Sequence, residues 1–271
     1  MQDYYQQKVV LITGASSGIG KALAIQLLDY GAYVFVCARN QDNLNSLIEQ
    51  HPHANLYTFK ADVSQEQECK AFVQFAIDSK GAIDILINNA GISMRALFVD
   101  LDLSVLHQSM NINFWGAVYC TKYALPSIIK NKGSVIGISS IAGYKGLPCR
   151  TGYSASKFAL QGFLESLRIE MLPSKVNVMW VSPGFVASNI RQVALGATGH
   201  SQGETPLNED KLMSAETCAD LIIKAIKKRK RTLIMTSQGV LTVWLNKFFP
   251  SFMDKKVLQH FQQEPNSPLK K

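Results

Sequence analysis

The stretch Val9-Val-Leu-Ile12, followed by Thr13-Gly-Ala-Ser-Ser-Gly-Ile-Gly20, decides the fold of this chain. The consecutive apolar residues predict a buried strand, and residues 22–28 are apolar at helical spacing. A glycine-rich turn therefore joins a strand to a helix. This order is typical of the first unit of a parallel sheet with helices packed on it.

The glycines of this turn have a physical purpose. Gly14 can adopt backbone angles that are closed to other residues, and Gly18 and Gly20 remove side chains where the backbone approaches a pyrophosphate or a neighbouring strand. The helix would direct its free N–H groups and positive end at the phosphates, and Ser16 and Ser17 add hydroxyl donors. A tight turn between packed elements is the alternative, but the position between strand and helix favours dinucleotide binding.

Short apolar runs alternate with helical patterns along the rest of the chain. Further strands are predicted near residues 33–37, 56–60, 83–87, 135–138, 176–181 and 232–235. Helices are predicted near residues 18–30, 41–50, 65–80, 104–130, 152–172 and 216–228. Because the strand runs are apolar on both faces, we expect an α/β fold with a doubly wound parallel sheet of about seven strands and helices on both faces. No linker-like segment interrupts the sequence, so we expect one domain over residues 1–271.

Composition narrows the classes of function. The formal net charge is +8, but much of it lies in Lys227-Lys-Arg-Lys-Arg231 and the last two lysines, and no nucleic-acid motif accompanies it. We therefore expect no nucleic-acid partner. The cysteines are widely scattered without metal-ligand spacing, so we expect free thiols in a reducing compartment and no metal site; they are Cys37, Cys69, Cys120, Cys149 and Cys218.

The ends of the chain add an expectation about location. The segment from Met1 to Lys8 is polar, which disfavours a secretory signal, and no apolar run is long enough to span a bilayer as a helix. A cytoplasmic protein is expected, with peripheral membrane contact as one interpretation of its tail.

A second stretch, Thr151-Gly-Tyr-Ser-Ala-Ser-Lys157, carries candidate chemistry. In a helix, Lys157 would lie about 6 Å along the axis from Tyr153 and on the same face. A phenol titrates near pH ~10, and a nearby ammonium would lower its pKa by stabilising the phenolate. Tyr153 could then exchange protons at neutral pH. The pair also occurs by chance on surface helices, so its weight depends on the motifs upstream.

The glycine spacing Gly-x-x-x-Gly-x-Gly, together with this pair, resembles the short-chain dehydrogenase/reductase family. The resemblance continues in chain order over residues from about 8 to 190, through Asn88-Asn-Ala-Gly91, Asn113, Ser139-Ser140 and Pro183-Gly184. It implies a single Rossmann domain that binds a nicotinamide dinucleotide.

The resemblance implies four catalytic residues. Tyr153 exchanges a proton with the substrate oxygen, and Lys157 lowers its pKa and bonds the nicotinamide ribose. Ser140 donates a hydrogen bond to the developing alkoxide. Asn113 holds a helix distortion and a water that extends the proton relay. A serine-hydrolase interpretation is disfavoured because no Gly-x-Ser-x-Gly elbow occurs.

The resemblance also implies the cofactor-binding residues. Besides Tyr153 and Lys157, they are Gly14, Ser16, Ser17, Gly18, Ile19, Gly20, Arg39, Asp62, Val63, Asn89, Ala90, Gly91, Pro183, Gly184, Val186 and Ser188. Val186 would bond the carboxamide through its backbone, and Ser188 stands where the family usually has threonine.

Cofactor preference depends on the end of the second strand. Ala38 stands where NAD-preferring relatives usually carry an Asp, and Arg39 can neutralise a 2′-phosphate, which favours NADP(H). A solvated surface arginine is the alternative. Asp62-Val63 match the family position that contacts the adenine, although Asp62 or Ser64 could instead be the N-cap of the next helix.

Two later segments concern the substrate. Residues 189–215 match the family's mobile flap, and the plausible pocket-lining residues are apolar: Met94, Leu147, Pro148, Phe185 and Ile190. The C-terminal extension, residues 236–271, has apolar and aromatic residues at helical spacing over 239–261, broken at Pro250 and interleaved with lysines. Two amphipathic helices are predicted there. They would form a membrane-surface anchor, or pack on a partner subunit or over the substrate pocket. Tail and flap look most like the 11β-hydroxysteroid dehydrogenase branch.

The resulting hypothesis is an NADP(H)-dependent oxidoreductase that interconverts a carbonyl and a secondary alcohol, on a lipidic or otherwise apolar substrate. One alternative is a 3-oxoacyl thioester reductase with the same machinery. Another is a catalytically silent NADP-binding scaffold or sensor. A homodimer or homotetramer is implied by resemblance alone, through the helix at 152–172 and the long helix before it.

Overall fold

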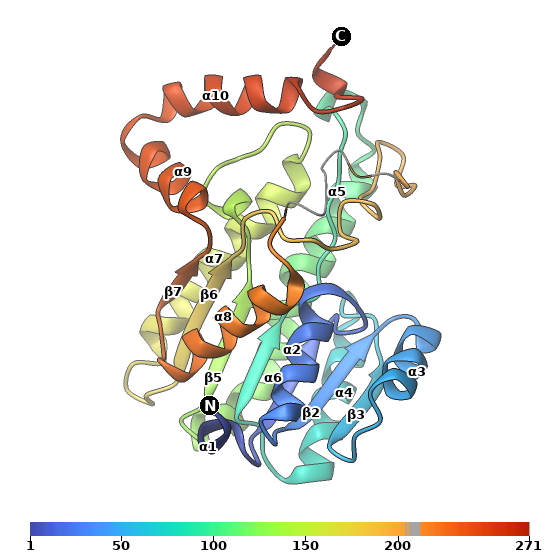
Figure 1. Cartoon of the computed structure of the whole chain (residues 1–271), viewed down its shortest axis with the longest axis vertical. Helices are drawn as coiled ribbons and strands as arrows, with labels where there is room; N and C mark the ends of the chain where they lie inside the picture. Colours follow the sequence, from blue (N-terminus) through green and yellow to red (C-terminus); the bar gives the residue numbers. More distant parts are fainter. Residues whose placement is uncertain (204, 206–211, 271) are drawn as a thin grey trace.

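The computed structural model describes residues 1–203, 205 and 212–270, which are built around one parallel sheet. The seven strands lie in the order β3-β2-β1-β4-β5-β6-β7 (Figure 1). They are β1 (Val9–Thr13), β2 (Tyr33–Ala38), β3 (Leu56–Lys60), β4 (Ile85–Asn88), β5 (Ser134–Ile138), β6 (Asn177–Ser182) and β7 (Thr232–Ile234). The predicted α/β class and doubly wound parallel sheet are confirmed.

Helices cover both faces of this sheet. One buried cluster joins the sheet to α2 (Gly18–Asp29), α3 (Gln41–Gln50) and α8 (Ala215–Lys227). The other joins it to α4 (Glu66–Lys80), α6 (Gly116–Lys130) and α7 (Thr151–Glu170). The remaining α-helices are α1 (Gln2–Tyr5), α5 (Leu103–Met110), α9 (Ser237–Phe248) and α10 (Pro250–Gln262).

The first strand shows why the apolar runs were continuous. Val10 and Ile12 pack in the cluster on one face, while Val9 and Leu11 pack in the cluster on the other. Successive strand residues point to opposite faces, so a strand covered on both sides needs apolar residues at every position.

The predicted long helix at 104–130 is interrupted near Asn113, where the resemblance implied a distortion. A π-helix, Asn111–Trp115, separates α5 from α6 in the structure. An apolar pattern does not distinguish a continuous α-helix from one with a single wider turn, because the residues on either side keep their faces. The short helix α1 was also not predicted.

The strand order reverses between β1 and β4. The chain runs from β1 outward through β2 and β3, then returns to β4 and continues through β5, β6 and β7. Connections after these two neighbouring strands diverge, which opens a crevice at the carboxyl edge of the sheet. The glycine-rich turn follows β1 and therefore lies at this crevice.

The C-terminal extension lies beyond that edge. Figure 1 shows α9 leaving β7 and α10 running across the top of the molecule, over the carboxyl ends of the strands. The two predicted helices are confirmed, and Pro250 is the first residue of α10. Proline is well tolerated there because the first N–H of a helix has no intrahelical partner.

The packing of the first turn of α2 predicts a severe effect of Gly20→Ala. An added Cβ would lie 2.5 Å from the Gly14 carbonyl oxygen and 2.9 Å from the Ala15 Cα, both backbone atoms that cannot move independently. We expect a loss of about 1–3 kcal/mol in the free energy of unfolding, measured by urea denaturation.

Gly162→Ala is the matched control within a helix. Nothing lies within 4 Å of its added Cβ, so alanine's higher helix propensity should leave stability unchanged or raise it by up to about 1 kcal/mol. Equal stability of the two variants would contradict the tight approach at Gly20.

Candidate active site

A cavity of about 1050 Å³ occupies the crevice at the carboxyl edge of the sheet. Its walls come from the segments after β1, β2, β3, β4, β5 and β6, from α7, and from α9 and α10. All predicted site residues line this cavity except two. Gly20 lies behind the glycine-rich turn, and Asn113 is buried behind Gly91.

The glycine-rich turn forms a cradle. Gly14 has a φ of 66°, and a Cβ there would lie 2.7 Å from the Cα of Ala90. Helix α2 begins at Gly18 and directs its first N–H groups to the cavity side, where Ser16 and Ser17 also lie. A dinucleotide pyrophosphate fits this combination of bare backbone, hydroxyl groups and a helix N-terminus.

Asn89 holds the cradle in place. Its side-chain amide donates to the carbonyls of Thr13 and Gly14, each at 2.9 Å. In return, the Thr13 hydroxyl accepts from the backbone N–H groups of Asn89 and Ala90, at 3.1 and 3.0 Å. These bonds join the ends of β1 and β4. Asn89 therefore acts on the shape of the cradle, besides lining the cavity.

The end of β2 forms the far end of the cavity. Arg39 is exposed there, after the buried Ala38, and Asn43 and Ser46 of α3 line the same wall. Sequence reasoning missed these two polar residues, since only their place on the first turns of α3 brings them beside Arg39.

Asp62 is not a helix cap. The N-cap of α4 is Gln65, so both sequence alternatives, a cap at Asp62 and a cap at Ser64, are wrong. The Asp62 carboxylate instead accepts from the N–H of Ser64 at 2.9 Å, which shapes the loop that places Asp62 and Val63 on the cavity wall.

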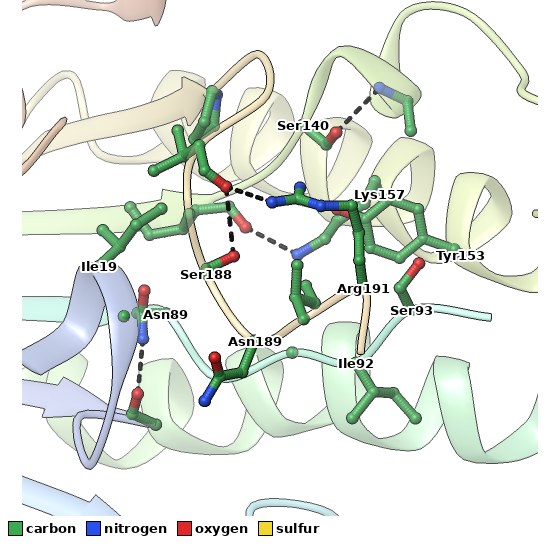
Figure 2. A pocket seen from close by; sticks show the side chains of 18 of the residues that line it. Ile19, Asn89, Ile92, Ser93, Ser140, Tyr153, Lys157, Ser188, Asn189 and Arg191 are labelled. Carbon is green, nitrogen blue, oxygen red and sulfur yellow. Dashed lines mark hydrogen bonds between the residues drawn. The ribbon is translucent and has the colours of Figure 1, made fainter. Parts of the chain in front are cut away.

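Helix α7 brings Tyr153 and Lys157 to one side of the cavity, as Figure 2 shows. The Lys157 Nζ lies 5.7 Å from the centre of the Tyr153 ring and donates to the Ile138 carbonyl at 2.8 Å. Lys157 is only 4% exposed. Burial disfavours the ammonium and lowers the pKa of Lys157 to about 8.

The pKa of Tyr153 shifts opposite to the sequence expectation. Burial raises it, and a hydrogen bond with Ser140 and the charges of Arg150 and Arg191 only partly counter this effect. The predicted lowering by Lys157 is therefore not what this structure shows. The reason is that desolvation destabilises an anionic phenolate more strongly than its neighbours stabilise it.

Ser140 follows β5 and faces the same space. Its hydroxyl accepts from the N–H of Ala142 at 3.1 Å and caps the short 3-10 helix Ile141–Gly143 (Figure 2). This bond fixes the rotamer that puts the hydroxyl beside Tyr153. Because the Ser140 oxygen accepts this bond, its hydroxyl proton is still available for donation.

Asn113 lies in the π-helix, where the resemblance implied a distortion. Its amide donates to the Ile92 carbonyl and to the Ser156 hydroxyl, each at 2.9 Å, and accepts from the Ile92 N–H at 2.7 Å. Asn113 therefore links the loop after β4 to α7, one residue before Lys157. Its role in a water relay stays a prediction.

The segment after β6 closes one side of the cavity. The Val186 carbonyl accepts from Arg191 Nη2 at 2.7 Å, and the backbone around Val186 pairs with Met213. Within the predicted flap, 189–215, residues 204 and 206–211 lie outside the described residues. Arg191 was missed by sequence reasoning because a flap without periodicity does not show which side chain turns inward.

The substrate side of the cavity is partly as predicted. Leu147, Phe185 and Ile190 line it, whereas Met94 and Pro148 do not. Met94 is fully buried in a separate apolar cluster with α5. Helices α9 and α10, which we call the roof, complete the lining. Sequence reasoning did not name their cavity-facing residues, which are Gln238, Gly239, Thr242, Met253, Lys256, Val257, His260 and Phe261.

A buried ion cluster fastens this roof. The Glu264 carboxylate lies 3.3 Å from Arg95 Nη2 and 3.2 Å from Arg150 Nη2. Arg95 also donates to the Pro265 carbonyl at 2.6 Å, and the Arg150 guanidinium stacks 4.5 Å from the centre of the Phe261 ring. Arg150 is the N-cap residue of α7, so the tail is tied directly to the helix that carries Tyr153.

The roof has further tethers nearer its start. Asn246 donates to the Tyr144 carbonyl at 2.9 Å, and Lys145 forms an ion pair with Asp254. Both partners on the body belong to the loop after the Ser140 segment. The inner face of α9 and α10 therefore packs over the cavity, which is one of the two arrangements expected for the tail.

Comparisons with known proteins found a matching family and several relatives. Residues 8–196 match the short chain dehydrogenase family. Dehydrogenase/reductase SDR family member 7B of Xenopus laevis is 34% identical over 262 residues, covering 92% of this chain and 80% of that protein. The 11-beta-hydroxysteroid dehydrogenase-like 4A of Arabidopsis thaliana is 36% identical over 253 residues, covering 92% and 83%.

A solved structure shows the same fold. The short chain dehydrogenase/reductase of Burkholderia phymatum in complex with NAD superposes with a TM-score of 0.82 at 20% identity, covering 92% of this chain and 95% of that one.

The ion cluster predicts a large effect of Glu264→Ala. The substitution leaves two guanidiniums, with side chains 5% and 12% exposed, without their shared counter-ion. We expect a loss of about 3–5 kcal/mol in the free energy of unfolding, measured by denaturant titration. Asp220→Ala removes a carboxylate from an exposed pair with Lys224 on α8 and should cost about 0.5 kcal/mol or less. Similar losses in both variants would show that the cluster does not hold the roof.

Proposed function

Because the chain belongs to the short-chain dehydrogenase family, we propose that this dehydrogenase/reductase uses NADP(H) to interconvert a carbonyl group and a secondary alcohol. One observation carries the proposal. Tyr153, Lys157 and Ser140 converge in the same cavity as the glycine cradle. A proton-exchanging group and a dinucleotide site therefore adjoin, which is the arrangement that hydride transfer coupled to proton transfer requires.

The cradle would hold the pyrophosphate of a nicotinamide dinucleotide between Gly14 and Gly18. Lys157 would bond its ribose, and the backbone of Val186 its carboxamide, once Arg191 releases the carbonyl that it now occupies. The bound nicotinamide supplies the hydride that is added to or removed from the substrate carbon.

The protein's own residues manage the proton. Burial raises the pKa of Tyr153, so its phenol is neutral at physiological pH and is ready to donate a proton to a carbonyl oxygen. Ser140 would donate a hydrogen bond to the same oxygen and stabilise the charge that develops there. Lys157 Nζ would stabilise the phenolate left behind. With its phenol neutral, Tyr153 can act as the proton donor when a carbonyl is reduced.

The preference for NADP(H) is supported by the end of β2. Ala38 offers no carboxylate to bond a ribose 2′-hydroxyl, and Arg39 lies on the same cavity wall as Asn43 and Ser46. A guanidinium with two polar neighbours suits a 2′-phosphate, whose charge an Asp at position 38 would repel.

An apolar substrate is supported by the lining of the other end. Leu147, Phe185, Met253, Val257 and Phe261 face this part of the cavity from three separate segments. A lipidic or steroid-like carbonyl suits such walls better than a sugar. A 3-oxoacyl thioester reductase would use the same residues and differs only in substrate. A silent NADP-binding scaffold is disfavoured because Tyr153, Lys157 and Ser140 are all present and brought together.

Tyr153→Phe tests the proposed mechanism. Loss of the phenol proton should lower kcat/KM by at least about 100-fold for any active carbonyl, since general acid catalysis contributes about that much. The assay is NADPH oxidation against acyl, steroid, retinoid and small carbonyls. Tyr57→Phe, which removes a hydroxyl outside the cavity, should retain full turnover. Undiminished turnover by Tyr153→Phe would contradict the proposed mechanism.

Arg39→Asp tests the cofactor preference. Replacing the guanidinium by a carboxylate should shift the ratio of kcat/KM for NADPH over NADH by about tenfold or more towards NADH, because a charge-assisted bond is lost and a repulsion gained. Lys228→Asp makes the same change in net charge at an exposed residue outside the cavity and should leave the ratio unchanged. An unchanged ratio for Arg39→Asp would show that another residue selects the cofactor.

A further inference from the structure

The roof presents a second, outward face that the cavity does not use. Six large apolar side chains on α9, α10 and their junction are each 50–55% exposed. We call them the apolar corner: Val240, Leu241, Trp244, Phe248, Phe249 and Phe252. The Trp244 ring lies 5.1 Å from that of Phe248 and 6.4 Å from that of Phe249, so these three exposed rings adjoin one another.

The orientation of the two helices is fixed by their inner face. Gly239, Met253 and Phe261 are buried against the body, and Asn246 and Asp254 make the tethers to the loop after Ser140. The apolar corner therefore cannot turn inward without breaking these contacts. In Figure 1 the junction of α9 and α10 projects from the body at the upper left.

Lysines surround the apolar corner. Lys247 Nζ lies 5.8 Å from the centre of the Phe248 ring, and Lys256 Nζ lies 5.8 Å from that of Phe252. Lys255 is exposed next to Lys256, whereas the one acidic residue of the two helices, Asp254, is paired with Lys145. The patch thus combines aromatic side chains with lysines that form no ion pair among the described residues, as helices that lie in a membrane interface do.

We propose that the apolar corner docks on the surface of an anionic lipid bilayer. Its rings would enter the boundary between headgroups and acyl chains, and the lysines would contact anionic headgroups at about 1 kcal/mol each. No helix in the described part of the chain is long and apolar enough to cross a membrane. In the proposed contact the inner faces of α9 and α10 stay on the body, and the contact does not depend on the proposed function.

Charge decides between a bilayer and a second copy of the chain. Two-fold pairing of this patch would gather Lys247, Lys255 and Lys256 of both copies in one interface. Like charges in such an interface repel, while an anionic bilayer satisfies both the rings and the lysines. The lipid surface is the occupant that the residues favour.

Vesicle co-sedimentation of the full chain tests the proposal. The wild type should pellet with vesicles of phosphatidylcholine and phosphatidylserine, and weakly with phosphatidylcholine alone. The triple variant W244Q/F248Q/F249Q should lose at least about tenfold in affinity for both, since each buried ring contributes about 1 kcal/mol or more. The triple variant K247Q/K255Q/K256Q should lose the preference for phosphatidylserine.

The matched control replaces exposed apolar residues elsewhere. Phe98, Val99 and Leu103 are 58–86% exposed, and F98Q/V99Q/L103Q should bind vesicles like the wild type. Circular dichroism and thermal melting confirm that each variant is folded. The proposal is overturned if the wild type stays in the supernatant with both vesicles, or if W244Q/F248Q/F249Q pellets unchanged. It is also overturned if that variant only dissociates an oligomer in sedimentation velocity, since a second copy then covers the patch.

Discussion

The clamp between the ends of β1 and β4 is the constraint on which the site depends. Four hydrogen bonds join Asn89 and Ala90, after β4, to Thr13 and Gly14, at the end of β1. They lie at the point where the strand order reverses. Because the turn is held to β4, the start of α2 and the loop after β4 face each other across one crevice. Gly91 continues that loop beside Asn113 and Lys157, so the clamp also sets the distance between the cofactor side and the catalytic side.

Burial is the common cause of the electrostatics at the catalytic side. It favours the neutral forms of both Tyr153 and Lys157, which raises the pKa of one and lowers that of the other. Ser140, Arg150 and Arg191 oppose this for the phenol. Arg150 is itself held by a carboxylate from the far end of the chain, so the roof contributes to the environment of Tyr153 besides closing the cavity.

Local signals explain what the sequence allowed us to predict. Strand runs and the glycine spacing are set by short segments, and they predicted the sheet and the cradle. The convergence of Tyr153, Lys157 and Ser140 was implied by the resemblance of the motif order to the family. The direction of the Tyr153 shift was wrong because burial is created by distant segments. The π-helix at Asn111–Trp115 left no mark in the apolar pattern. Arg95, Arg150 and Glu264 carried no signal, since their attraction exists only after the fold brings them together.

The shared counter-ion also limits how such a fold can diversify. The other tethers of α9 and α10, Asn246 to Tyr144 and Asp254 to Lys145, each join a single pair of residues. The Arg95, Glu264 and Arg150 cluster is different, because losing Glu264 leaves two buried guanidiniums without their shared carboxylate. A lineage whose remodelled tail loses Glu264 must therefore replace Arg95 and Arg150 as well, or pass through an unstable intermediate.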